Sequence, residues 1–246
     1  MKIKNKKSSH VGMIVSFVVF ITFVVFLYSV VKPVINVGED KTATLSYIQM
    51  RIIENISSNF TSATVIWSAD VNPKTECVQL VNFLGFLELS LPPRVIVKNE
   101  KNKIEKEVYL FDEVVPDLEI NRDDKEHRFF RVYSSPEFNV IETLPLPKCE
   151  ELTSYTIGSV TTGGYVFENK MYQMINGYRT GYEKLKTALN IPPGTEFGFD
   201  FVQNNGTIIS LGEPPQTVSV HASEIPIQYI DENANLLSGF INAKVW

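Results

Sequence analysis

The segment Val11–Val31 reads VGMIVSFVVFITFVVFLYSVV and holds no charged residue in its 21 positions. A helix of this length is about 31 Å long, which matches the hydrocarbon thickness of a bilayer. Eleven of the residues are β-branched and would favour a strand in water. A lone strand in lipid, however, leaves its backbone groups without hydrogen-bond partners. We therefore predict one transmembrane helix, with Val11 and Val31 at its ends.

The charges on either side of this segment predict its orientation. Four lysines precede it and no acid does, whereas the residues after it are nearly balanced in charge: Lys32, Glu39, Asp40 and Lys41. The positive-inside rule then places residues 1–10 in the cytoplasm as a basic tail and the chain from Lys32 onward outside the membrane. A cleaved signal peptide is less favoured, because the apolar run is longer than about 15 residues and no A-x-A-like site follows it.

The remaining composition describes an acidic folded domain. The chain has 23 basic and 28 acidic residues, and removing the four N-terminal lysines leaves 19 against 28. Such a balance gives no positive surface for nucleic acid, which we exclude as a partner. At 44% hydrophobic residues, the part after the membrane segment is rich enough to bury the core of one large domain or two small ones.

Hydrophobic periodicity predicts an α+β fold. Residues 32–62 read as a connector and an amphipathic helix, because apolar residues recur every three or four positions: Leu45, Ile48, Ile52, Ile56 and Phe60. Residues 63–160 form a β-rich region of short apolar runs, with strands expected at 63–67, 78–84, 86–91, 94–98, 104–111, 128–133 and 138–141.

Residues 161–246 are expected to hold one further helix and two β-hairpins. The helix covers Tyr165–Asn190 and is stopped by Pro192-Pro193. Asn204-Asn205-Gly206 is typical of a tight hairpin turn, and 231–235 is the turn of the second hairpin. The prediction is therefore a transmembrane helix continuing into an amphipathic helix, followed by a β-rich external domain of antiparallel sheets. Whether residues 63–160 and 161–246 form one domain or two is left open.

Both cysteines, Cys77 and Cys149, fall in the part predicted to be external, where thiols can oxidise. One disulfide between them would close a loop of about 73 residues and contribute roughly 4 kcal/mol in the chain-entropy model. The alternative is a pair of buried free thiols. A zinc site is not favoured, because neither cysteine has a second ligand at metal spacing.

Three asparagines match the N-x-S/T glycosylation pattern: Asn55, Asn59 and Asn205. External placement would make their modification possible, although three matches in a chain of this length also arise by chance. Asn205 has a second interpretation as part of the hairpin turn.

No segment matches a catalytic, cofactor or metal motif. The charged run 121–128, which contains His127, lacks the spacing and the glycine of a calcium loop. Gly158–Gly164 precedes the expected helix but lacks the Lys-Ser/Thr ending of a phosphate-binding loop, and we interpret it as a flexible linker or turn. We therefore expect no enzymatic activity, no cofactor and no metal.

Residues 2–60 resemble the type IV pilin-like proteins, especially archaeal ones, which carry a class III signal peptide. The resemblance rests on the short basic leader, the apolar helix directly after it and the amphipathic continuation. It implies a membrane-anchored surface protein, with leader cleavage at Ser8 or Ser9. Pilin leaders usually end in Gly or Ala, and the glutamate common at the fifth mature position is replaced by Met13 or Ile14.

These observations predict a single-pass, membrane-anchored, extracytoplasmic structural or surface-interaction protein, with a pilin-like subunit as its most specific form. The expected partners are the lipid bilayer and, through the N-terminal helix, further copies of the chain or other pilin-like subunits. A monomeric ligand-binding ectodomain, such as a receptor or adhesin, is the alternative. A membrane-bound hydrolase is less favoured still.

Overall fold

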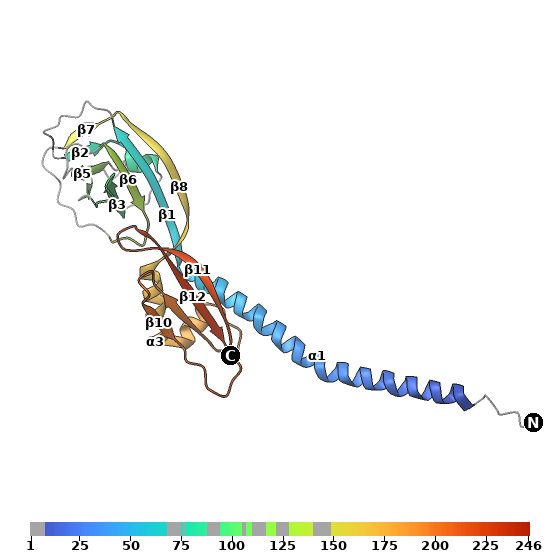
Figure 1. The fold of residues 1–246 in the computed structure, drawn as a ribbon. Coiled ribbons are helices and arrows are strands. Elements are labelled where there is room, and N and C mark those ends of the chain that lie inside the picture. The colour runs from blue at the N-terminus through green and yellow to red at the C-terminus, as the bar shows by residue number, and fades with distance from the viewer. Residues whose placement is uncertain are drawn as a thin grey trace, which may run out of the picture.

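The computed structural model describes residues 8–67, 75, 77–87, 94–104, 107–109, 117–121, 128–139 and 149–246. Side chains are described for these residues except 8–10, 31–40 and 107–109. The chain is α+β, with a long N-terminal helix followed by a β-rich part that holds one further long helix (Figure 1).

Helix α1 (Ser8–Ile56) runs for 49 residues without a break. The connector expected after the apolar segment is itself helical, so the two predicted helices are one. The second half of α1 buries the predicted apolar stripe, since Ile48 and Ile52 have 0% exposure and Leu45 and Ile56 are also buried. Phe60 is buried too, but it belongs to strand β1 (Ser57–Trp67) rather than to the helix.

The folded part of the chain consists of two units. We call the first one the helical lobe; it comprises residues 41–56, the second half of α1, and residues 168–246. Its sheet contains β9 (Phe197–Val202), β10 (Ile208–Leu211), β11 (His221–Ile230) and β12 (Leu236–Val245). Helix α3 (Glu168–Ala188) and the second half of α1 contribute to the same hydrophobic core as these strands. Both predicted hairpins are confirmed, because β9 pairs with β10 and β11 pairs with β12, each antiparallel.

Polar side chains of α1 fix this helix between a strand and the end of α3. Gln49 Nε2 donates to the carbonyl of Ser223 on β11, at 3.1 Å. Arg51 Nε donates to the carbonyl of Leu189 just after α3, at 3.2 Å, and the Tyr47 hydroxyl donates to the carbonyl of Asn190. These bonds satisfy backbone groups that a strand edge and a helix end leave open.

We call the second unit the sandwich lobe, residues 57–167. On one side of its hydrophobic core lie four strands: β1, β3 (Val95–Asn99), β6 (Phe129–Ser134) and β8 (Tyr155–Phe167). They share a hydrophobic core with residues of a 4-stranded sheet of order β4-β5-β2-β7 and with the short helix α2 (Phe83–Phe86). The strands of that second sheet are β2 (Cys77–Leu80), β4 (Glu107–Tyr109), β5 (Leu118–Asn121) and β7 (Glu150–Leu152).

One sheet passes through both lobes, with strand order β10-β9-β12-β11-β8-β1-β6-β3. Among the strands that the structure describes, the two lobes meet in this sheet where β8 and β11 run parallel, at Val166 opposite Tyr229 and Phe167 opposite Ile230. The sandwich lobe lies at the end of the molecule away from the N-terminus, with the helical lobe between them (Figure 1).

Several sequence predictions are wrong in detail. Gly158–Gly164 is not a linker but part of β8, and the helix expected from Tyr165 begins at Glu168. Phe86, expected in a strand, ends α2, and Phe138 lies in a bend. The two hydrophobic cores divide the chain near residues 57 and 167, and the prediction of regions 63–160 and 161–246, as one domain or two, stays a prediction.

Candidate functional site

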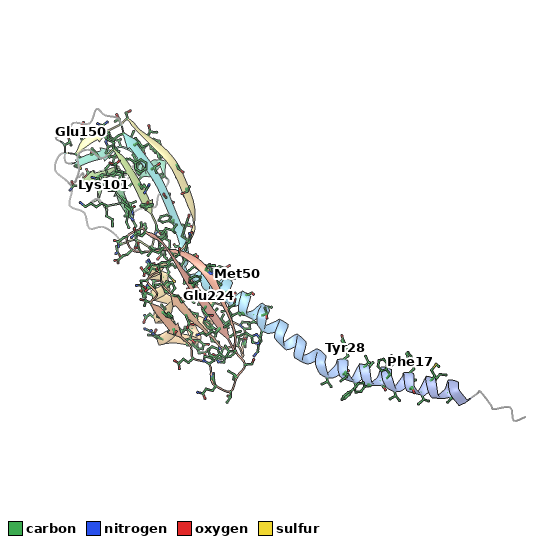
Figure 2. The ribbon with its side chains drawn as sticks, viewed as in Figure 1. Phe17, Tyr28, Met50, Lys101, Glu150 and Glu224 are labelled. Carbon is green, nitrogen blue, oxygen red and sulfur yellow. A yellow bond between two sulfur atoms is a disulfide. The ribbon has the colours of Figure 1, made fainter. Side chains whose placement is uncertain are left out.

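The first half of α1 is exposed along its whole described length. Residues Val11–Val30 form a helix long and apolar enough to cross a membrane, and none of it is buried against the rest of the chain. Phe17 and Tyr28 are each 64% exposed and project from the helix, away from the two lobes (Figure 2). The hydroxyls of Thr22 and Ser29 donate to carbonyls one turn back, each at 2.9 Å. These two hydroxyls therefore find their hydrogen-bond acceptors within the helix. Such internal pairing is what a lipid environment, which offers no water, would demand of polar groups.

The junction between the lobes is a small apolar cluster of its own. Phe60 lies at its centre, with ring centroids of Tyr133, Phe138, Tyr165 and Phe167 between 5.2 and 6.2 Å away. Ile230 and Ala234 from the end of β11 and the turn after it complete the buried set. Because its members come from both lobes, this cluster packs the sandwich lobe against the helical lobe.

A buried lysine crosses the same junction. Lys98 on β3 is 2% exposed, and its ammonium donates to the carbonyl of Ala234 at 3.1 Å and to Asn235 Oδ1 at 2.8 Å. Asn235 Nδ2 in turn donates to Asp231 Oδ2 at 2.8 Å. Burial lowers the pKa of Lys98, the nearby Asp231 carboxylate raises it and Arg131 lowers it. The lysine thus ties the sandwich lobe to the β11–β12 turn of the helical lobe.

A second polar tie lies at the start of α3. Asn169 Nδ2 donates to the backbone carbonyl of Glu137 at 2.9 Å and to its Oε2 at 3.2 Å. Lys170 Nζ donates to the carbonyl of Ser57 at 2.9 Å, with a longer ion pair of 3.9 Å to Glu137. The lobes are therefore held by side chains on both sides of the aromatic cluster.

Carboxylates gather on the α3 side of the β11–β12 turn. Burial raises the pKa of Glu168, and the charges of Asp231 and Glu232 raise it further, while a hydrogen bond from Gln203 lowers it. The Gln203 amide donates to Glu168 Oε1 at 2.8 Å. These acids line a narrow cleft of about 180 Å³ together with Asn139 and Asn169.

A second titratable cluster joins α3 to β9. The Tyr182 hydroxyl donates to Glu196 Oε2 at 2.6 Å and accepts from the backbone N–H of Phe197 at 3.1 Å, and Lys186 Nζ lies 2.8 Å from Glu196 Oε1. Burial raises the pKa of Tyr182, and the hydrogen bonds from Lys186 and Tyr182 lower the pKa of Glu196. These shifts favour a protonated phenol beside an ionised carboxylate, and their hydrogen bond ties α3 to the start of β9.

The structure brings Cys77 and Cys149 together in a disulfide, with their Cα atoms 4.5 Å apart. The bridge joins the start of β2 to the residue before β7. Glu119 is the third residue near these sulfurs, but bridged sulfurs are not thiolates, and only thiolates bind metal ions strongly.

All three asparagines of the glycosylation pattern are exposed. Asn55 lies in the last turn of α1 and Asn59 lies on β1. Asn205 is in the β9–β10 turn, where its Oδ1 accepts the backbone N–H of Thr207 at 2.9 Å. Their modification stays a prediction.

Other predicted residues are placed only in part. Ser8 and Ser9, the leader-cleavage candidates, lie in the first turn of α1, and Val31 continues this helix, but their side chains are outside the described set. His127 and most of the charged run around it fall outside the described residues.

Sequence reasoning missed the junction residues, above all Lys98 and Asn235. The one available signal was the lysine that interrupts the apolar run Val95-Ile-Val-Lys98. That signal is weak, because alternation alone does not reveal what covers a sheet face.

Comparisons with protein-family models, with curated proteins and with solved structures find no match to this chain. Its function must therefore be argued from the geometry above.

Proposed function

We propose that this chain is a single-pass, membrane-anchored, extracytoplasmic surface-interaction protein that holds its sandwich lobe away from the bilayer on a rigid spine. One observation carries the proposal. A single helix is bare and apolar in its first half, and in its second half it forms part of the core of a folded lobe.

The geometry supports a rigid connection between membrane and lobe. The helix continues for 25 residues beyond Val31, to Ile56, or about 37 Å. Because Ile48 and Ile52 are fully buried in the helical lobe, the lobe cannot turn independently of this part of the helix. The aromatic cluster and Lys98 then fix the sandwich lobe to the helical lobe, at the far end of the molecule (Figure 1).

Two features support an external location for the lobes. The four lysines before the apolar segment favour a cytoplasmic N-terminus. The disulfide between Cys77 and Cys149 is typical of proteins that fold outside a reducing cytoplasm.

Protease protection of the full chain in intact cells tests the anchor and its direction. With one epitope tag at each end, we expect external protease to remove the C-terminal tag and leave the N-terminal tag protected until the cells are lysed. The reverse pattern would contradict the orientation.

A charge variant separates anchoring from folding. Val19→Lys combined with Val24→Lys places two charges at the helix centre, each costing about 3 kcal/mol in lipid, and should release the protein from membranes. Met50→Lys is the matched control, because Met50 is 51% exposed on the packed half of the same helix. Equal membrane retention of both variants would refute the anchor.

A pilin-like subunit is the second candidate, favoured by the same combination of a bare helix half and a packed one. The mass of the intact protein from its native cells tests it. Loss of the residues up to and including Ser8 or Ser9 supports prepilin-type processing, and an uncut chain favours the plain anchor.

A further inference from the structure

A cleft of about 510 Å³ opens where the two lobes meet. Its floor is the face of β1, β3, β6 and β8 that points away from the sandwich core, and its wall is the β11–β12 turn with the first residues of β12. The volume falls within the range of small-molecule sites, about 300–1,000 Å³. Phe60, Tyr133 and Tyr165 of the aromatic cluster belong to the lining of this cleft. Their packing against one another keeps the cleft in shape.

Three hydroxyl side chains form a row across the floor. Ser62 on β1 is opposite Tyr133 on β6 and, on its other side, opposite Thr161 on β8. Residues in direct register on neighbouring strands point to the same face, with Cβ atoms about 5 Å apart. The cleft is therefore lined by three hydroxyl-bearing side chains from one face of neighbouring strands, and by Asn102 and Asn235.

Apolar surface alternates with these polar groups. Tyr165 is half-buried, and its ring lies edge-on to Phe60 with centroids 5.2 Å apart. Leu236 is 53% exposed, and it lines the opposite wall together with Leu237. Rings and leucines give a C–H-rich ligand an apolar contact, while the hydroxyls and amides bond to its oxygens.

Among the described residues that line the cleft, the only charged side chain is Lys98. Both of its recorded acceptors are neutral oxygens, those of Ala234 and Asn235. The carboxylate of Asp231 is bonded to the Asn235 amide and to the backbone N–H groups of Asn233 and Asn235. In a chain of net charge −5, the described lining of this cleft holds one ammonium and no carboxylate, and the Asp231 carboxylate outside the lining acts on the same ammonium.

We propose that the cleft binds an acidic saccharide, a uronic acid unit of a glycan. The row of Ser62, Tyr133 and Thr161 bonds to the sugar hydroxyls, Tyr165 and Leu236 contact the ring, and the carboxylate faces Lys98. This goes beyond the proposed anchor and does not depend on the side of the membrane on which the lobes lie, so failure of either proposal leaves the other intact.

Matched sugars test the ligand class. The full chain is placed in phosphatidylcholine nanodiscs, which avoid sugar-headed detergents, and titrated at pH 7 with galacturonic acid and with galactose. The two differ by a carboxylate in place of a hydroxymethyl group. We expect the uronate to bind at least about tenfold more tightly, because a charge-assisted hydrogen bond contributes more than a neutral one. Absence of uronate binding, or equal binding of both sugars, would overturn the proposal.

Variants that remove single polar groups test whether the uronate binds in this cleft. Thr161→Val removes one hydroxyl of the row and should weaken uronate binding about fivefold, the effect of one neutral hydrogen bond. Asn102→Gly removes an amide and keeps the left-handed backbone of that residue, whose φ is 62°. Thr156→Val is the control, since Thr156 is exposed on the same strand outside the cleft. Unchanged affinity in the Thr161→Val, Asn102→Gly double variant would refute this site, with melting temperatures showing that every variant is folded.

Discussion

The two lobes bury their hydrophobic cores with different sets of secondary-structure elements. The helical lobe combines strands of 10 residues, β11 and β12, with two helices from opposite ends of the chain. The sandwich lobe is one continuous stretch whose second sheet has strands of only 3 or 4 residues. Such short strands contribute few ladder hydrogen bonds, and this is the lobe that carries the disulfide. The comparison teaches that the cross-link lies in the lobe whose second sheet is built of short strands, where a constraint on the unfolded chain adds stability that few ladder bonds supply.

Removing the disulfide should have the largest effect and should affect only one lobe. We expect Cys77→Ala with Cys149→Ala to lower the stability of the sandwich lobe by about 4 kcal/mol, because the cross-link closes a long loop in the unfolded chain. Hydrogen exchange measured by mass spectrometry should speed up in residues 57–167 and stay unchanged in 197–246. Faster exchange in both lobes to the same degree would mean that they unfold as one unit.

Ile52→Ala is the corresponding test of the helical lobe. Ile52 has 0% exposure, and truncating a buried isoleucine costs about 2–5 kcal/mol. We expect the loss to appear in β11, β12 and α3 and to leave the sandwich core protected. Met50→Ala, two residues earlier and half exposed, should change stability by less than about 0.5 kcal/mol. Similar losses from both variants would argue against the observed packing of α1.

Lys98→Met tests how strongly the lobes are coupled. The variant leaves the carbonyl of Ala234 and the side chain of Asn235 without their buried donor, at a cost of about 2 kcal/mol. A double-mutant cycle with Asn235→Ala should give a non-zero coupling energy, measured by denaturant unfolding of the full chain. Lys101→Met, at an exposed position of the next turn, is the control. If the stability losses of the two single variants simply added up in the double variant, the hydrogen bond between Lys98 and Asn235 would contribute nothing to stability.

Glu168→Gln should have the smallest effect, and its sign depends on pH. Burial and two neighbouring acids raise the pKa of Glu168 above 4.5 in the folded chain. The folded chain then binds this proton more tightly than the unfolded chain, so the wild type gains stability as pH falls through the folded-state pKa toward 4.5. The variant lacks that gain and should be more stable at pH 7, by less than about 1 kcal/mol after solvent screening. Melting curves at pH 4.5 and 7 measure both differences.

Local sequence patterns predicted the elements whose environment repeats along the chain. The stripe of Leu45, Ile48, Ile52 and Ile56 indicated a helix because one face meets one core. Asn204-Asn205-Gly206 indicated a hairpin because few residues adopt the required backbone, and Gly206 has a φ of 81°.

The patterns failed where a distant segment decides the outcome. Gly158–Gly164 was interpreted as a turn from its glycines, yet it is a strand because β1 pairs with it, Phe60 opposite Gly163. A Cβ on Gly158 would clash with Thr64 Oγ1, so that glycine permits close approach rather than a turn. Phe138 was expected in a strand and instead packs at the junction.

By itself, the sequence determined the apolar helix, its amphipathic continuation and the two C-terminal hairpins. These depend on side-chain periodicity and turn chemistry, which act over a few residues. Only the tertiary structure decided that 57–167 is inserted between two parts of the helical lobe, that Lys98 is buried, and that Ser62, Tyr133 and Thr161 share one face of a cleft. The physical reason is that tertiary contacts join residues as far apart as Gln49 and Ser223, which are 174 positions apart, and local propensity carries no information about such partners.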